Sequence, residues 1–147
     1  MVINDRESAA LEKLLKIART KTDEAGRRIA ALEATREKTA ASLRQLAETV
    51  SKEEAAARSA DIVGLAQLSG FLVGASKKRD ALEATKAQIA AEIELARSEL
   101  SEAYSETQKL EHLVERARLA SERRARRTEA NDLNEAAIAR FVRKSGR

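Results

Sequence analysis

Apolar side chains recur at alternating steps of three and four residues over most of this 147-residue chain. A repeat of 3.5 residues keeps one apolar stripe facing a partner helix and imposes a left-handed supercoil. Two runs carry the repeat, one from Leu11 to Val50 and one from Leu65 to Ala117. Polar residues interrupt the stripes at Thr22, Arg36, Thr39, Arg79, Lys86 and Thr107. The repeat predicts two long coiled-coil helices.

Composition excludes most other classes of protein. Charged residues make up 35% of the chain and aromatic residues only 2%, which leaves too few large apolar side chains for a compact catalytic domain. The absence of cysteine excludes disulfides and thiolate metal sites. His112 is the only histidine, so no metal site can be completed around it. We therefore expect no enzyme activity, no small-molecule substrate, no cofactor and no metal.

The stretch between the two stripes differs in composition. It holds three of the five glycines, at positions 64, 70 and 74, and glycine weakens a helix interior. Ser59 and Asp61 are candidate N-caps, because a short polar side chain can accept a hydrogen bond from a free backbone N–H. The expected elements are a helix over about 5–57, a turn over about 58–61 and a helix over about 62–142, within a single domain of residues 1–147.

A short turn between two heptad helices predicts a long antiparallel two-helix coiled-coil hairpin, an all-α fold. A fold-back near residue 60 places Val50 opposite Ser69 and Leu11 near Gln108 or Lys109. The second helix is longer, so its C-terminal part overhangs the first. The hairpin predicts a monomer, and a long dimer with stripes paired between chains is the alternative.

The start of the second helix is the most apolar segment of the sequence. Leu65, Leu68 and Leu72 continue the stripe and are expected to be buried between the helices. Ile62, Phe71 and Val73 fall off the stripe, and we expect Phe71 to be largely exposed on the outer face. These three residues predict a docking patch near the turn, and local packing of the tip is the alternative.

The last thirty residues carry the excess of positive charge, with nine basic and four acidic side chains over 118–147. The basic cluster consists of Arg118, Arg123, Arg124, Arg126 and Arg127. A solvated helix face, an acidic protein partner and nucleic acid are all compatible with it. No aromatic residue is interleaved to stack a base, which disfavours nucleic acid. A short amphipathic segment with Leu133, Ile138 and Phe141 follows the cluster.

Several segments of the chain resemble the flagellar export protein FliJ family. The opening Leu11-Glu12-Lys13-Leu14-Leu15-Lys16-Ile17-Ala18 is similar to the start of that family, and Phe71 matches an aromatic residue after the turn. The basic run 122–127 leads into Glu129-Ala130-Asn131-Asp132-Leu133-Asn134-Glu135-Ala136-Ala137, which resembles the closing pattern of the family. The resemblance covers most of the chain.

The resemblance implies a non-enzymatic protein similar to the central stalk of rotary ATP synthases. Its terminal end would enter the hexameric flagellar export ATPase, using the basic cluster with Leu133 and Phe141. Its tip would contact the membrane export gate or export chaperones through Ile62, Phe71, Val73 and Ala75. Lys78 and Leu82 depart from the residues expected there. The protein would be cytoplasmic and peripherally associated with the membrane export apparatus.

Two other functions stay open from the residues alone. One is a generic coiled-coil scaffold whose partner the sequence does not specify. The other is a basic helical protein that binds nucleic acid through the arginines of residues 118–127.

Overall fold

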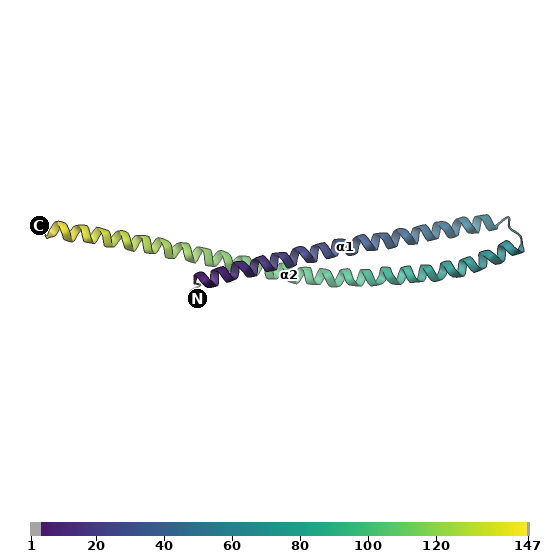
Figure 1. Ribbon diagram of the computed structural model, residues 1–147, viewed down its shortest axis with the longest axis horizontal. Helices are drawn as coiled ribbons and strands as arrows, with labels where there is room; N and C mark the ends of the chain where they lie inside the picture. Colours follow the sequence, from purple (N-terminus) through teal and green to yellow (C-terminus); the bar gives the residue numbers. More distant parts are fainter. Residues whose placement is uncertain (1–3, 147) are drawn as a thin grey trace. The chain divides into compact units, whose positions relative to one another are not determined.

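The structure is a computed structural model that describes residues 4–146. Two long helices account for nearly all of them, α1 over Asp5–Ala57 and α2 over Ile62–Ser145 (Figure 1). No strand occurs among the described residues. The chain is thus all-helical, with two long helices packed together, and α2 ends beyond the expected residue 142. Contacts divide the chain into two units, and each is described separately below.

At the start of each helix a side chain accepts a hydrogen bond from a backbone N–H group that has no partner within the helix. At α1 the side chain of Asn4 accepts a hydrogen bond from the Glu7 amide at 2.8 Å, and the Glu7 carboxylate accepts one from the Asn4 amide at 3.0 Å. This reciprocal pair is a capping box. At α2 the Asp61 carboxylate accepts a hydrogen bond from the Gly64 amide at 2.8 Å. Of the two cap candidates, Asp61 is therefore the N-cap, whereas the Ser59 hydroxyl donates back toward the Ala56 carbonyl.

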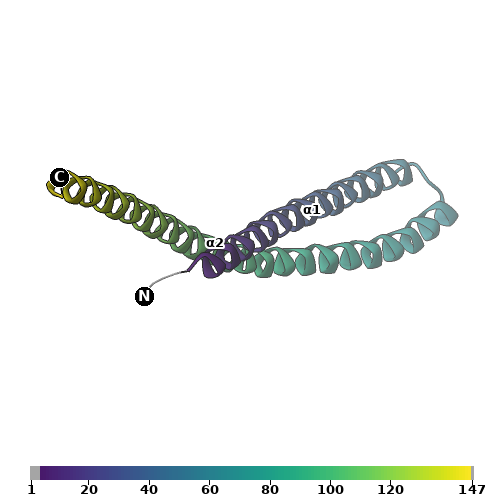
Figure 2. The same ribbon diagram turned by 60° about the vertical axis from the view of Figure 1, so that its left-hand side comes forward.

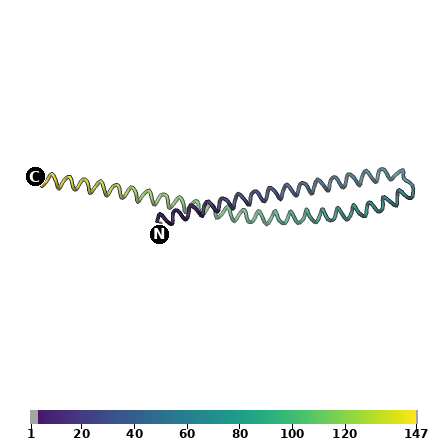
Figure 3. Tube along the Cα trace, viewed as in Figure 1, coloured from purple at the N-terminus to yellow at the C-terminus, as the bar shows by residue number. Residues whose placement is uncertain are grey.

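Gly64 allows the chain to turn tightly into α2. A Cβ atom at this position would lie 2.7 Å from the Cβ of Ala60, closer than side-chain carbons approach one another. Any larger residue would push the connection away from the first turn of α2. The glycine and the Asp61 cap thus act together to start the helix at Ile62. The chain reverses direction over the short connection that precedes it (Figure 3).

Loss of the α2 cap should have a measurable cost. We expect Asp61→Ala to lower the free energy of unfolding by about 1 kcal/mol, because the Gly64 amide loses its acceptor. Chemical denaturation followed by far-UV circular dichroism measures the change. Glu48→Ala, at an exposed site on α1, is the control and should change stability by less than about 0.5 kcal/mol. Equal effects of the two substitutions would show that Asp61 does not cap α2.

The first unit contains residues 1–22 and 102–147. Its core is a cluster of Leu15, Ala18 and Leu110, against which Leu11 and Val114 pack. The hydroxyls of Thr22 and Thr107 lie 3.1 Å apart, so these two interruptions of the stripes form a hydrogen bond to each other. Leu11 therefore packs against the cluster that contains Leu110. Gln108 and Lys109, which were expected near Leu11, are exposed.

The second unit contains residues 23–101 and the connection between the helices. Within it α1 and α2 run side by side in opposite directions (Figures 1 and 2). Ion pairs between exposed side chains join them, Arg28 to Glu99 at 3.7 Å and Arg97 to Glu33 at 3.5 Å. The buried side chains of this unit are mostly small: Thr39, Ala57, Ala75, Ile89, Ile93 and Ala96. Ile93 is the large side chain that is almost completely enclosed, with 1% of its surface exposed.

The expected helix register of the second unit is wrong. Val50 lines a hollow with Leu72 and Ala75, rather than lying opposite Ser69. At the connection α2 begins further out than α1 ends, so the pairing of the two helices is shifted along α2 (Figure 2). Leu65, expected to be buried, is 51% exposed, whereas Leu68 and Leu72 are half-buried.

Candidate partner-binding surfaces

The α2 segment after Ala117 presents most of the basic cluster to solvent. Arg123, Arg126 and Arg127 are exposed, and Arg124 is half-buried. Beyond Arg124 every described residue is exposed, including Leu133 at 71% and Phe141 at 71%. The segment therefore offers both positive charge and large apolar side chains.

Helical spacing aligns the charged and apolar parts of this segment. Phe141 follows Arg123 by 18 residues, which is five turns of an α-helix, and Leu133 follows Arg126 by seven, about two turns. Asp132 precedes Phe141 by nine residues, two and a half turns, and so points the other way. We call the side with Arg123, Arg126, Leu133 and Phe141 the terminal face. It is basic toward Ala117 and apolar toward Ser145.

Arg118 differs from the other arginines of the cluster. Its guanidinium forms ion pairs with the carboxylates of Glu115, at 2.6 Å, and Glu122. The hydrogen bonds with Glu115 raise the pKa of Arg118 and lower the pKa of Glu115. The charge of Arg118 is thus largely balanced within α2, so this residue adds less positive potential than its neighbours do.

The sequence analysis named Ile138 as part of the amphipathic segment but missed three other exposed apolar residues. Ile138 and the first of these, Val142, are 63% and 61% exposed and lie one turn apart, beside the terminal face. In the first unit, Leu14 and Ile17 are about half exposed and line a hollow with Leu110. The signal for Leu14 and Ile17 was present in the sequence, because each directly precedes a stripe position and is apolar without being part of the stripe.

The tip of the second unit differs in part from the expected docking patch. Ile62 and Val73 are 85% and 56% exposed, as a docking patch requires. Phe71, expected to be largely exposed, is only 36% exposed. It lines two hollows together with side chains of α1, so it lies beside α1 rather than on the outer face of α2. Ala75, also expected to bind a partner at the tip, is only 9% exposed and occupies a stripe position facing α1. We therefore leave Ala75 out of the docking patch. We call Ile62, Phe71 and Val73 the tip patch.

Lys78 and Leu82, the two positions that depart from the family pattern, line the larger of these hollows together with Phe71. The hollow has a volume of about 540 Å³. It is bordered on α2 by Gly70 and Gly74, which have no side chains to fill it. The small residues therefore leave Phe71 accessible along one edge.

Over residues 4–146, no group of three or more His, Cys, Asp or Glu side chains is placed to hold a metal ion. His112 is exposed on α2. Neither helix, within the described range, contains a segment long and apolar enough to cross a membrane.

Comparison with known proteins identifies the family. The chain matches the family described as Flagellar FliJ protein over residues 7–146, which is almost its whole length. No curated protein and no solved structure matches the chain. The FliJ family is a non-catalytic component of flagellar protein export, and the resemblance noted in the sequence is thereby confirmed. The chain belongs to the FliJ family of flagellar export proteins.

Proposed function

We propose that this chain is a central-stalk-like component of the flagellar export apparatus. The two helices form an antiparallel coiled-coil hairpin in a monomer, and α2 overhangs α1. The chain works without catalysing a reaction, by binding other components of the apparatus. Membership of the FliJ family supports a role in export, and the ion pairs of Arg28 with Glu99 and of Arg97 with Glu33 support antiparallel pairing.

The first partner in this proposal is the hexameric export ATPase, bound through the terminal face. The observation that carries the proposal is the exposure of Arg123, Arg126, Leu133 and Phe141 along one side of α2. Apolar anchors supply most of the energy of an interface, and charged neighbours supply orientation and association rate. Arg124 and Arg127 flank this face, and Arg118 precedes it in α2. The half-exposed Leu14 and Ile17 extend the apolar surface of the same unit.

The rate of ATP hydrolysis tests this proposal directly. Adding the chain to the purified hexameric ATPase should raise the rate until it saturates. No change in rate and no complex in sedimentation would contradict the proposal. A generic coiled-coil scaffold would give that negative result.

A nucleic-acid-binding role is the competing proposal for the arginines. Contacts with phosphates would give an affinity for DNA that falls steeply as salt rises. The apolar half of the terminal face gives no advantage in such a complex, and no aromatic residue is interleaved with the arginines to stack a base. We therefore expect no saturable DNA binding at physiological salt.

The second partner is the membrane export gate or an export chaperone, bound through the tip patch. Exposed Ile62 and Val73 supply its apolar anchors, and Phe71 contributes the edge that α1 leaves uncovered. Binding at the two ends would associate a cytoplasmic protein peripherally with the membrane apparatus.

Substitutions at the tip should separate binding from stability. We expect the double variant Ile62→Ser with Val73→Ser to weaken gate binding at least tenfold while changing stability by less than about 1 kcal/mol, because both side chains are exposed. Phe71→Ala should weaken binding too, but with a larger loss of stability, because most of its ring is covered. Calorimetric titration with the cytoplasmic part of the gate measures the first quantity and chemical denaturation the second. Unchanged gate and chaperone binding by the double variant would exclude the tip patch.

A further inference from the structure

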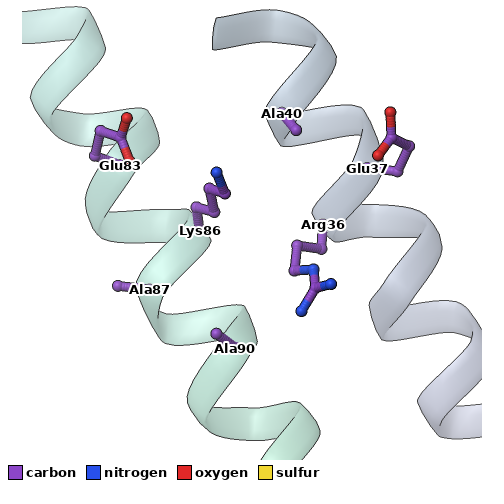
Figure 4. A pocket seen from close by; sticks show the side chains of 7 residues that line it. All are labelled: Arg36, Glu37, Ala40, Glu83, Lys86, Ala87 and Ala90. Carbon is purple, nitrogen blue, oxygen red and sulfur yellow. The ribbon is translucent and has the colours of Figure 1, made fainter.

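The C-terminal turns of α2 carry positive charge and no negative charge. After Glu135 the sequence contains no further Asp or Glu and four basic residues: Arg140, Arg143, Lys144 and Arg147. The paired helices differ from this end, as one place in the second unit shows. There, side chains of both signs line one hollow between α1 and α2 (Figure 4): Arg36, Glu37, Glu83 and Lys86. The end of α2 is thus basic, whereas the charges around that hollow are mixed.

Large apolar side chains lie in the same turns of α2 as these cations. Phe141 is 71% exposed, and Ile138 and Val142 are exposed to a similar extent. Ile138 and Val142 are one turn apart, and Phe141 lies about 60° around the helix from Ile138. Every described residue after Arg124 is exposed, so nothing within residues 4–146 covers this surface. We call Ile138, Phe141 and Val142 the end patch.

Helix geometry places the arginines on the side opposite the end patch. Arg140 follows Ile138 by two residues, and Arg143 follows Phe141 by two, which is about 200° around an α-helix. Lys144 follows Phe141 by three residues and so borders the patch, about 60° away. A long lysine side chain can lay its carbon atoms on an apolar surface and keep its ammonium in water. The last turns of α2 therefore form a short amphipathic helix with a basic polar side.

A partner helix paired along the stripe would find little to contact here. Continued beyond Ala117 in steps of four and three residues, the stripe of α2 meets five polar positions before it reaches Ile138: Ser121, Arg124, Thr128, Asn131 and Glu135. A coiled coil needs apolar residues at such positions over several turns. A lipid surface has no such requirement, because a short amphipathic helix can lie in the headgroup region with only its apolar side inserted.

We propose that residues 136–146 of α2 bind an anionic lipid surface, with the end patch inserted among the headgroups and the cations next to lipid phosphates. Anionic lipids attract basic segments, so the charge of this end complements such a surface. Phe141 also belongs to the terminal face, so this side chain cannot contact lipid and the ATPase at the same time. The proposal goes beyond the export function and does not depend on it, since vesicles of pure lipid contain neither the ATPase nor the gate.

Sedimentation of the full chain with lipid vesicles tests the proposal. We expect saturable binding to vesicles of equimolar phosphatidylcholine and phosphatidylglycerol, at least about tenfold tighter than to phosphatidylcholine alone. Ile138→Ser with Val142→Ser should weaken this binding at least about tenfold, because the inserted area is reduced. Ile62→Ser with Val73→Ser is the matched control, since it makes the same replacements at exposed positions of the second unit. This control should bind within about twofold of the unchanged chain.

A second pair of variants tests the cations. Glutamine at Arg140, Arg143 and Lys144 should remove the preference for phosphatidylglycerol. Glutamine at Lys38, Lys52 and Lys77 removes the same charge from exposed positions of the second unit and should retain the preference. Far-UV circular dichroism without vesicles should show unchanged helicity in all four variants, because every replaced side chain is exposed.

Tryptophan fluorescence identifies the side of α2 that enters the lipid. The chain contains no tryptophan, so a single introduced one reports its own position. With anionic vesicles, emission from Phe141→Trp should shift to shorter wavelength, whereas emission from Ala139→Trp, about 200° away around the helix, should not.

Three results would overturn the proposal. The first is equal or absent binding of the unchanged chain to the two kinds of vesicle. The second is equal weakening by a variant at the end of α2 and its matched control, which would assign binding to overall charge or composition. The third is the same emission shift, or none, at positions 139 and 141, which would exclude insertion through the end patch.

Discussion

Replacing Ile93 by alanine should destabilise the protein by about 2–4 kcal/mol. Ile93 is 1% exposed and lies on α2 between the buried Ile89 and Ala96, in a unit whose other buried side chains are mostly small. The substitution removes three carbon atoms from this contact and leaves a cavity that two rigid helices can close only in part. Alanine is the better helix former, so the loss cannot come from helix propensity.

Leu95→Ala is the matched control for Ile93→Ala. It removes the same number of carbon atoms two residues away, but Leu95 is 59% exposed. Its cost should stay near about 0.5 kcal/mol. Urea denaturation of both variants, followed by circular dichroism, provides the comparison. Equal destabilisation would mean that α2 does not pack against α1 through the stripe that contains Ile93.

Reversing four charges on and beside the terminal face should abolish tight binding to the export ATPase. The variant replaces Arg123, Arg124, Arg126 and Arg127 by glutamate. Placing like charges against a complementary surface costs several kcal/mol, and about 1.4 kcal/mol corresponds to a tenfold loss of affinity. We therefore expect binding to weaken by about 100-fold or more. Helicity should be retained, because glutamate and arginine have similar helix propensities.

The control for charge reversal uses four exposed cations of the second unit. Arg27, Lys38, Lys52 and Lys77, each replaced by glutamate, give the same change in net charge. ATPase binding by this control should stay within about threefold of the unchanged chain, since distant exposed charges are screened by salt. Sedimentation with the labelled ATPase measures both affinities. Similar weakening in the two variants would assign the effect to net charge rather than to the terminal face.

The helices could be predicted because a 3.5-residue repeat and a turn rich in polar residues are local signals. The register between the two helices could not be predicted from these signals. The offset between α1 and α2 depends on contacts between residues far apart in the sequence, such as the hydrogen bond between Thr22 and Thr107 and the ion pair of Arg28 with Glu99. Leu65 is 51% exposed despite its stripe position.

The surfaces were predicted less evenly than the helices. Exposure of Arg123, Leu133 and Phe141 follows from the greater length of α2, a quantity that the sequence contains. The partial burial of Phe71 depends on α1 side chains that border it across the interface, so it requires the register. The sequence was compatible with two roles for Ala75, packing in the stripe and binding a partner. Its burial in the structure favours packing.

The number of chains bound to one ATPase ring tests the central claim most directly. A central stalk occupies the single axis of a hexamer, so the complex should contain one chain for six ATPase subunits. The mass of the complex, measured by native mass spectrometry or sedimentation, gives this ratio. We predict one chain per hexamer at saturation. The variant with four reversed charges on and beside the terminal face should form no such complex. Six chains per ring, or no complex at all, would contradict a stalk-like role.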